Sequence, residues 1–127
     1  MPFISFNKAT DPAAPDDLRI NTTAVLYVEA SRPDLLGETT IHMLGQGSSV
    51  NAVTQSIGTV VSEIGSLVAA KRHYLAPPPD GGASTVYIAP WNVSYVRPNL
   101  PLAQDFWYVK FVDGSELRII NPLPEGL

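Results

Sequence analysis

The chain has 127 residues, a formal net charge of −4 and no cysteine, and 45% of its residues are hydrophobic against 16% charged. This is enough apolar material for one compact domain or two very small ones. The acidic balance argues against a nucleic-acid polymer as partner. The absence of an apolar run of about 18 residues argues against a membrane span, and the lack of cysteine excludes disulfides and zinc–thiolate sites. No secretory signal is visible, so a cytoplasmic location is expected.

The first part of the chain reads as short strands separated by turns. Alternating apolar and polar residues predict strands at residues 3–6, 18–20, 24–30, 39–44 and 48–52. The proline- and aspartate-rich segment 11–17 predicts a loop, and the glycines of 45–47 predict a hairpin turn. These strands form the first β unit.

Residues 53–72 form the one long segment with a helical period. Its apolar residues fall on one stripe of a 3.6-residue helix: Val53, Ile57, Val60, Val61, Ile64, Leu67 and Val68. Many of them are β-branched, so a buried strand is the competing interpretation. Length and period favour a helix, with Lys71, Arg72 and His73 at its negative end and Pro77 beyond it.

A second stripe on this predicted helix consists of small residues. Its members are Gly58, Ser62, Gly65 and Ala69. A glycine inside a helix costs about 1 kcal/mol relative to alanine, so two of them require a reason. One reason is close approach of the same helix of a second subunit in a homodimer or higher oligomer. The alternative is tight packing on the helix's own sheet.

A second β unit follows a linker. Prolines and glycines make residues 75–84 an exposed linker. Strands are then predicted at 85–89, 92–97, 106–112 and 116–120, with a turn at Asp113-Gly114. The expected division is a first unit with its helix at 1–74, the linker, and a second unit at 85–127, together forming one compact domain.

The two units repeat each other. Six residues correspond at one constant offset (88 − 20 = 68): Ile20, Val25, Tyr27, Val28, Ile41 and Met43 match Ile88, Val93, Tyr95, Val96, Val109 and Phe111. A one-residue gap in the turn then aligns Gly47 with Gly114. The predicted fold class is α+β and β-rich, with two copies of a small antiparallel strand-hairpin unit and one amphipathic helix after the first copy.

No motif in the sequence indicates catalysis. His42 is expected on the surface of a strand and His73 at the end of the helix, and neither lies in a serine or aspartate motif. We therefore predict that the protein is not an enzyme, although carboxylates alone can serve as acid and base.

Metal and phosphate motifs are absent as well. Asp11, Asp16 and Asp17 lack the spacing of an EF-hand and are expected in a solvated loop. The segment 45–48 lacks the lysine of a P-loop and precedes a strand. No metal and no cofactor are expected.

One cluster in the second unit suggests ligand binding. Its members are Trp91, Asn92, Arg97, Trp107, Tyr108, Lys110 and Arg118. Aromatic rings stack on planar groups and cations neutralise phosphate, so these residues suit a nucleotide-like anion. Lys110 and Arg118 are expected on paired strands of one hairpin, where they converge. The alternative is an amphipathic sheet with core aromatics and solvated cations.

The first copy resembles the short FlbD-type flagellar regulators. The matching positions are Ile20-Asn21, Val25, Val28, 41–44, Gly47, Ser56-Ile57, Val60 and Ile64. The resemblance implies a small β-sheet with one helix. In size and style the whole chain also resembles small phage-encoded proteins, among them anti-defence sponges that sequester cyclic nucleotide or cyclic ADP-ribose signals at subunit interfaces.

The expected function is therefore non-enzymatic. The leading hypothesis is an oligomeric protein that captures an anionic small molecule, such as a nucleotide-derived signal, at a pocket between copies or subunits. The alternatives are a structural or assembly component of a phage particle or appendage, and a flagellar-type regulator.

Overall fold

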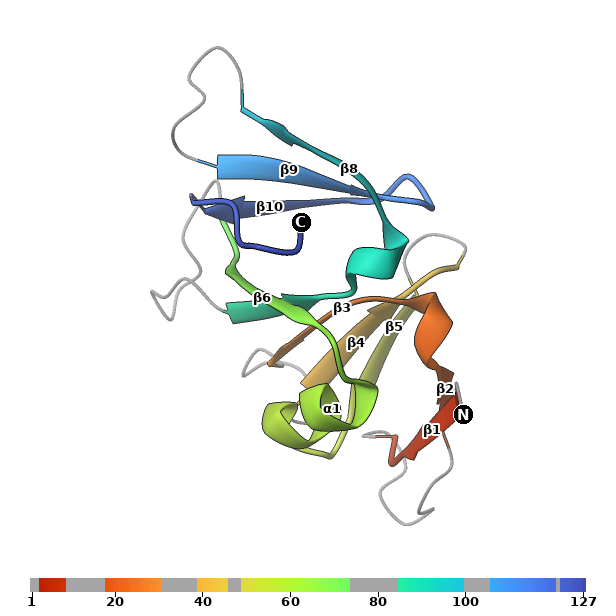
Figure 1. Cartoon of the computed structure of the whole chain (residues 1–127). Helices are drawn as coiled ribbons and strands as arrows, with labels where there is room; N and C mark the ends of the chain where they lie inside the picture. The colour runs from red at the N-terminus through yellow and green to blue at the C-terminus, as the bar shows by residue number, and fades with distance from the viewer. Residues whose placement is uncertain are drawn as a thin grey trace.

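The computed structural model in Figure 1 describes residues 3–8, 18–30, 39–45, 49–73, 85–99, 106–120 and 122–127. Within these residues the chain forms ten strands in three antiparallel sheets and a single α-helix. The fold is therefore α+β and β-rich, as the alternating pattern predicted. The expected 11–17 loop, the 75–84 linker and residues 46–48 of the hairpin turn lie outside the described residues.

The first copy contains five strands and a short 3₁₀ turn. They are β1 (Phe3–Phe6), β2 (Leu18–Asn21), η1 (Thr22–Ala24), β3 (Val25–Ala30), β4 (Thr39–Met43) and β5 (Ser49–Val53). β1 pairs with β2, and β3, β4 and β5 form a meander. An isolated bridge between Lys8 and Val53 brings the end of the hairpin to the end of the meander.

The second copy has the same elements in the same order. They are β6 (Val68–Lys71), β7 (Thr85–Ile88), η2 (Pro90–Asn92), β8 (Val93–Pro98), β9 (Phe106–Phe111) and β10 (Glu116–Ile120). β6 pairs with β7, and β8, β9 and β10 form the meander. A bridge between Arg72 and Ile119 closes this copy as Lys8 and Val53 close the first.

The pairing registers confirm the repeat in detail. The 3₁₀ turns and the strands after them coincide at the predicted offset (90 − 22 = 68 and 93 − 25 = 68). Both copies have a bulge at the same place, after Val25 and after Val93. The gap in the hairpin turn is two residues, not one. The partner of Ile41 is Asn51 and that of Val109 is Leu117, so the offset falls from 68 to 66 (117 − 51).

The helix is much shorter than the predicted 53–72. α1 spans Ile57–Ile64, and Ser56 caps its start by accepting a hydrogen bond from the Thr59 amide. Gly65 ends it with φ 77° and ψ 155°, a conformation essentially restricted to glycine. Beyond Gly65 the chain pairs with β7 as strand β6. The repeat in the structure thus begins at β6, before the expected linker.

The two copies join through one pair of strands. β3 pairs with β7, which gives a five-stranded sheet in the order β5-β4-β3-β7-β6. The described residues form two apolar cores, one mainly from each copy, although Ala89 joins the first core and Leu26 and Tyr27 join the second. The helix α1 closes the first core through the fully buried Val60. In the second copy Leu123 and Leu127, after β10, pack against the core instead. None of the helices in the described part of the chain is long and apolar enough to cross a membrane.

Candidate functional site

The residues predicted to bind a ligand lie in three places. Trp91 and Asn92 lie on η2, at the junction of the two copies. Trp107 points into the core of the second copy. Four others lie on the opposite face of the β8-β9-β10 sheet: Arg97, Tyr108, Lys110 and Arg118. The sequence placed these residues in one cluster, but the structure divides them.

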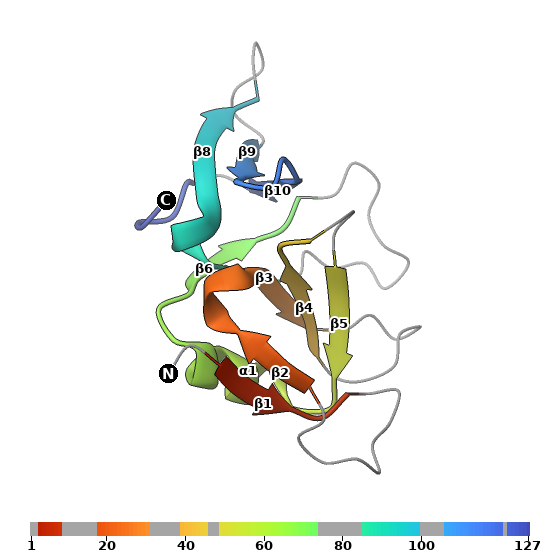
Figure 2. The same ribbon diagram turned by 90° about the vertical axis from the view of Figure 1, so that its right-hand side faces the viewer.

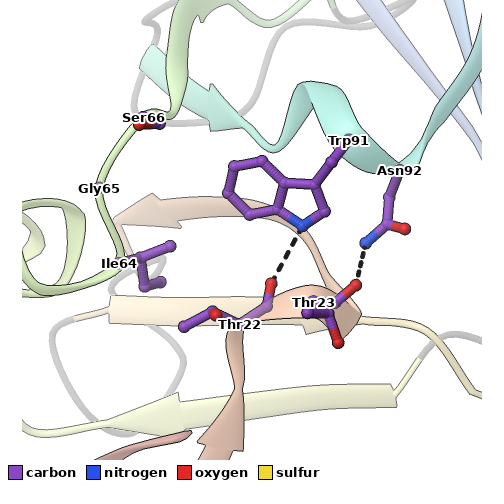
Figure 3. Close-up of a pocket in the computed structure, with 7 residues that line it drawn as sticks. All are labelled: Thr22, Thr23, Ile64, Gly65, Ser66, Trp91 and Asn92. Atoms are coloured by element: carbon purple, nitrogen blue, oxygen red, sulfur yellow. Dashed lines mark hydrogen bonds between the residues drawn. The ribbon is translucent and has the colours of Figure 1, made fainter. Parts of the chain in front are cut away.

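An open pocket of about 620 Å³ lies where η1, η2 and the end of α1 meet. It is lined by Thr22, Thr23, Ile64, Gly65, Ser66, Trp91 and Asn92 (Figure 3). The Trp91 Nε1–H donates to the Thr22 carbonyl oxygen at 3.1 Å, and the Asn92 amide donates to the carbonyl oxygens of Thr23 and Val25 at 2.7 Å each. These side chains therefore hold the copies together.

The lining residues of the pocket carry no charged side chain and combine apolar surface with a few hydroxyl and amide groups. Trp91 is 41% exposed, so part of its indole is accessible for stacking on a planar group. Hydroxyl groups of Thr22, Thr23 and Ser66 are the polar side chains beside it, together with Asn92. An anion finds no cation among these lining residues.

The outer surface of the β8-β9-β10 sheet carries the cations. Residues directly opposite in antiparallel strands point to the same face. Arg97 pairs with Tyr108, which pairs with Arg118, and Tyr95 pairs with Lys110. Residues 108 and 110 alternate with Val109 and share one face. These five residues, Tyr95, Arg97, Tyr108, Lys110 and Arg118, are called the basic face below.

Two of the three cations of the basic face have no carboxylate partner among the described residues. The Arg97 guanidinium lies 4.1 Å from the centre of the Tyr108 ring, and that of Arg118 lies 6.0 Å from the centre of the Phe106 ring. Lys110 reaches the Glu116 carboxylate at 3.8 Å. Glu116, which lies opposite Lys110 on this face, is the one described carboxylate beside these three cations, so the basic face is net positive on a chain of net charge −4.

Trp107 does not belong to the basic face. It lies on the side of β9 that carries Val109 and Phe111 and packs against the core of the second copy. A ligand on the outer surface therefore does not reach it through that face. Tyr95, which was not among the residues predicted to bind a ligand, lies on the basic face and is 49% exposed. The internal repeat could have identified Tyr95 from the sequence, because it aligns with Tyr27 at the offset of 68.

Both histidines lie in places other than those predicted. His73 is not near the helix: its ring stacks on Phe106 with centroids 4.2 Å apart, and its buried Nδ1 has no hydrogen-bond partner among the described atoms. His42 is not on the surface. Its ring stacks on Tyr27 at 4.0 Å, and its Nε2 lies 2.8 Å from a Glu29 oxygen.

Glu29 is the centre of an ionic network between the copies. The Arg72 guanidinium donates to both of its carboxylate oxygens, at 3.1 and 2.8 Å. Burial alone would raise the pKa of Glu29, but the hydrogen bond from His42 and the charges of Arg72 and His42 outweigh it and lower that pKa below its ordinary value. Arg72 thus neutralises a buried carboxylate and does not cap a helix as predicted.

The basic face is the counterpart of a buried surface in the first copy. At the offset of 68, Tyr95, Arg97, Tyr108 and Lys110 correspond to Tyr27, Glu29, Thr40 and His42. The second copy covers this surface of the first: Tyr27 stacks on Phe111, and Glu29 binds Arg72. The second copy leaves its own equivalent surface exposed at Tyr95 and Arg97.

The predicted small-residue interface is not a single helical stripe. Gly58 and Ser62 are exposed on α1, Gly65 follows its last residue, and Ala69 is exposed on β6. A Cβ added at Gly58 or Gly65 would meet no described atom within 4 Å, so neither glycine serves close packing on the described sheets. The contact of these residues with a second subunit remains a prediction.

The described residues contain no group of three His, Asp or Glu side chains placed to hold a metal ion. The geometry therefore offers two candidate sites, the uncharged pocket at Trp91 and the basic face. Comparison with family models, with curated proteins and with solved structures finds no match to this chain.

Proposed function

We propose that this protein is a non-enzymatic binding protein that captures a phosphate-bearing small molecule on its basic face. The observation that carries the proposal is the pair of arginines, Arg97 and Arg118, that have no carboxylate partner among the described residues. Guanidinium groups bind phosphate through charge-assisted hydrogen bonds in a fixed planar geometry. Arg97 and Arg118 lie on either side of Tyr108 in one row across three strands. An anion bound between them would contact both guanidinium groups.

The aromatic residues of the basic face suit a nucleotide rather than inorganic phosphate alone. The exposed Tyr95 ring beside Lys110 offers a surface on which a base stacks. Sequestration of a nucleotide-derived signal without turnover is the activity that such a surface supports. The one histidine with an oriented carboxylate partner, His42 beside Glu29, lies in the contact between the copies and not on the basic face, which is the reason for proposing binding without catalysis there.

A thermal-shift panel tests the proposal. Ligands that bind only the native state raise its free energy of unfolding, by about 2.7 kcal/mol at a concentration of 100 times Kd. We expect ATP and cyclic dinucleotides to raise the melting temperature and adenosine, which lacks phosphate, to have little effect. Arg97→Gln and Arg118→Gln should each reduce the shift. Arg19→Gln, which removes an exposed arginine from β2, is the matched control and should retain the full shift. No shift with any phosphate compound would overturn the proposal.

A second candidate is a structural role in an assembly. The observation that favours it is the strand β8, which carries the exposed Tyr95 at the edge of its sheet. Edge strands with exposed aromatic residues pair readily with other chains. In this case the melting temperature would not respond to nucleotides, while the mass of the particle in solution would exceed that of one chain.

A further inference from the structure

Within the described ranges, the internal repeat leaves two complementary sheet edges unpaired. β3 uses both of its edges, one for β4 and the other for β7. Among the residues that the structure describes, its equivalent β8 pairs with β9 alone, and β2, the equivalent of β7, pairs with β1 alone. In the described part of the chain, β8 therefore lacks the neighbour that β7 provides for β3. Likewise, β2 lacks the neighbour that β3 provides for β7.

The contact between the two copies is head to tail. If a two-fold axis related them, β8 would pair with β2 wherever β3 pairs with β7. The structure instead has β8 and β2 in different sheets, and the two strands extend in opposite directions from the contact between η1 and η2 (Figures 1 and 2). Contacts of this kind do not close within one pair of units, so the same contact can repeat between molecules.

We propose that chains associate head to tail, with β8 of one chain pairing antiparallel with β2 of the next chain. Within the chain, β3 and β7 set Tyr27 opposite Ile88, Val28 opposite Tyr87 and Glu29 opposite Val86. The offset of 68 (88 − 20) transfers this register to the contact between chains. It sets Tyr95 opposite Ile20, Val96 opposite Arg19 and Arg97 opposite Leu18 of the next chain.

The exposure of β8 is that of a strand without its neighbour. Tyr27 and Val28 are 8% and 0% exposed, whereas Tyr95 is 49% exposed and Val96 is half-buried. Antiparallel pairing with a further strand would satisfy the outer backbone groups of β8 and cover part of the Tyr95 ring. Pro98 lies one residue beyond the three proposed pairs, so its missing N–H does not interrupt them.

The contact between chains has fewer side-chain anchors than the contact within the chain. The hydrogen bonds from Asn92 have no equivalent, because residue 24 is alanine. The counterpart of the Glu29–Arg72 pair is Arg97 facing Lys8 of the next chain, since Lys8 and Arg72 hold equivalent bridges. We therefore expect an association that is weaker than the internal one and is best detected by covalent trapping.

Disulfide trapping tests the register directly, because the chain has no cysteine of its own. Arg19→Cys and Val96→Cys are made as separate full-length variants, checked for folding by circular dichroism, mixed in equal amounts and oxidised. We expect a covalent dimer from the mixture and little from either variant alone. Carrying both substitutions on one chain should give covalent multimers, because each chain then offers both edges.

Glu63→Cys, on the exposed face of α1, mixed with Val96→Cys measures random collision. A yield from the Arg19–Val96 mixture no greater than this background would overturn the proposal. So would Val96→Cys crosslinking to itself as strongly as the mixture, since that means β8 pairing with β8. If either variant fails to fold, Leu18→Cys with Arg97→Cys repeats the test in the same register.

Discussion

Tyr27 and Tyr95 occupy equivalent positions in the two copies, yet Tyr27 is 8% exposed and Tyr95 is 49% exposed. The difference arises because the second copy covers the surface around Tyr27, through Phe111 and Arg72, whereas no described element covers Tyr95 in the same way. The residues on this surface differ between the copies accordingly. Glu29 of the first copy binds Arg72, while Arg97 at the equivalent position lies against Tyr108.

Glu29→Gln should destabilise the protein by about 2 kcal/mol at pH 7, since hydrogen bonds to a buried charged group contribute about 1.5–3 kcal/mol. The pKa of Glu29 is lowered in the folded state by His42 and Arg72. Its contribution is therefore present above the unfolded-state pKa, near 4.5, and is lost as the pH falls through the lower folded-state pKa. Urea unfolding at pH 7 and at acidic pH measures the difference between wild type and variant, which should shrink with acid.

The control for that prediction is Glu63→Gln, which removes a carboxylate from the exposed face of α1. A surface substitution of this kind changes the free energy of unfolding by about 0.5 kcal/mol or less. If Glu29→Gln proves as stable as the Glu63 variant at pH 7, the ionic network does not stabilise the contact between copies.

Gly65 and Gly58 should respond to alanine in opposite directions. Gly65→Ala should lower the free energy of unfolding by about 2 kcal/mol, because φ 77° and ψ 155° are strained for any residue with a Cβ. Gly58→Ala should stabilise by about 0.5–1 kcal/mol, because Gly58 is helical and its added methyl group meets no described atom. Thermal unfolding of the two variants compares them. Equal effects would show that Gly65 does not set the end of α1.

Asn92→Ala should lower the free energy of unfolding by about 1–3 kcal/mol, because it leaves the buried Val25 carbonyl oxygen at the junction without its side-chain donor. Trp91→Phe removes one exposed hydrogen bond to Thr22 but keeps an aromatic ring at this position, so a smaller loss is expected. Chemical denaturation measures both. A larger loss of stability in the Trp91 variant would show that the Trp91 indole contributes more to the junction than the Asn92 amide does.

Charge at the contact between chains should control the association. Arg97 and Lys8 of the next chain repel each other in the proposed arrangement, and a bound anion would relieve the repulsion. Lys8→Glu should therefore raise the yield of Arg19–Val96 trapping, and ATP should raise the yield of the chain with native Lys8. A lower yield from Lys8→Glu would contradict the proposed proximity of residues 8 and 97.

Most strands were predictable because each is short, alternates and is bounded by turn residues. The repeat was predictable because Tyr27 and Tyr95, with their neighbours, match at one offset. Strand β6 was not, since Val68–Lys71 continues the helical spacing of α1 and only its pairing with β7 shows it to be a strand. The positive φ of Gly65, which separates the two, has no unique sequence signature because glycine also occurs inside helices.

The candidate site was predictable in part for a similar reason. Strand alternation places Tyr108 and Lys110 on one face, and hairpin pairing adds Arg118. The same alternation puts Trp107 on the opposite face, yet it does not say which face is buried. His42 and Arg72 reach Glu29 only through packing between copies, which no local pattern encodes.

We propose that the surface buried in the first copy binds an anion in the second. The most direct measurement is calorimetric titration of ATP into wild type, the Arg97→Gln/Arg118→Gln double variant and Arg19→Gln. Losing a charge-assisted contact costs about 1.5–3 kcal/mol, or at least about tenfold in Kd. We predict binding by wild type and by Arg19→Gln, and at least that loss in the double variant. Equal affinity of wild type and double variant would contradict the account.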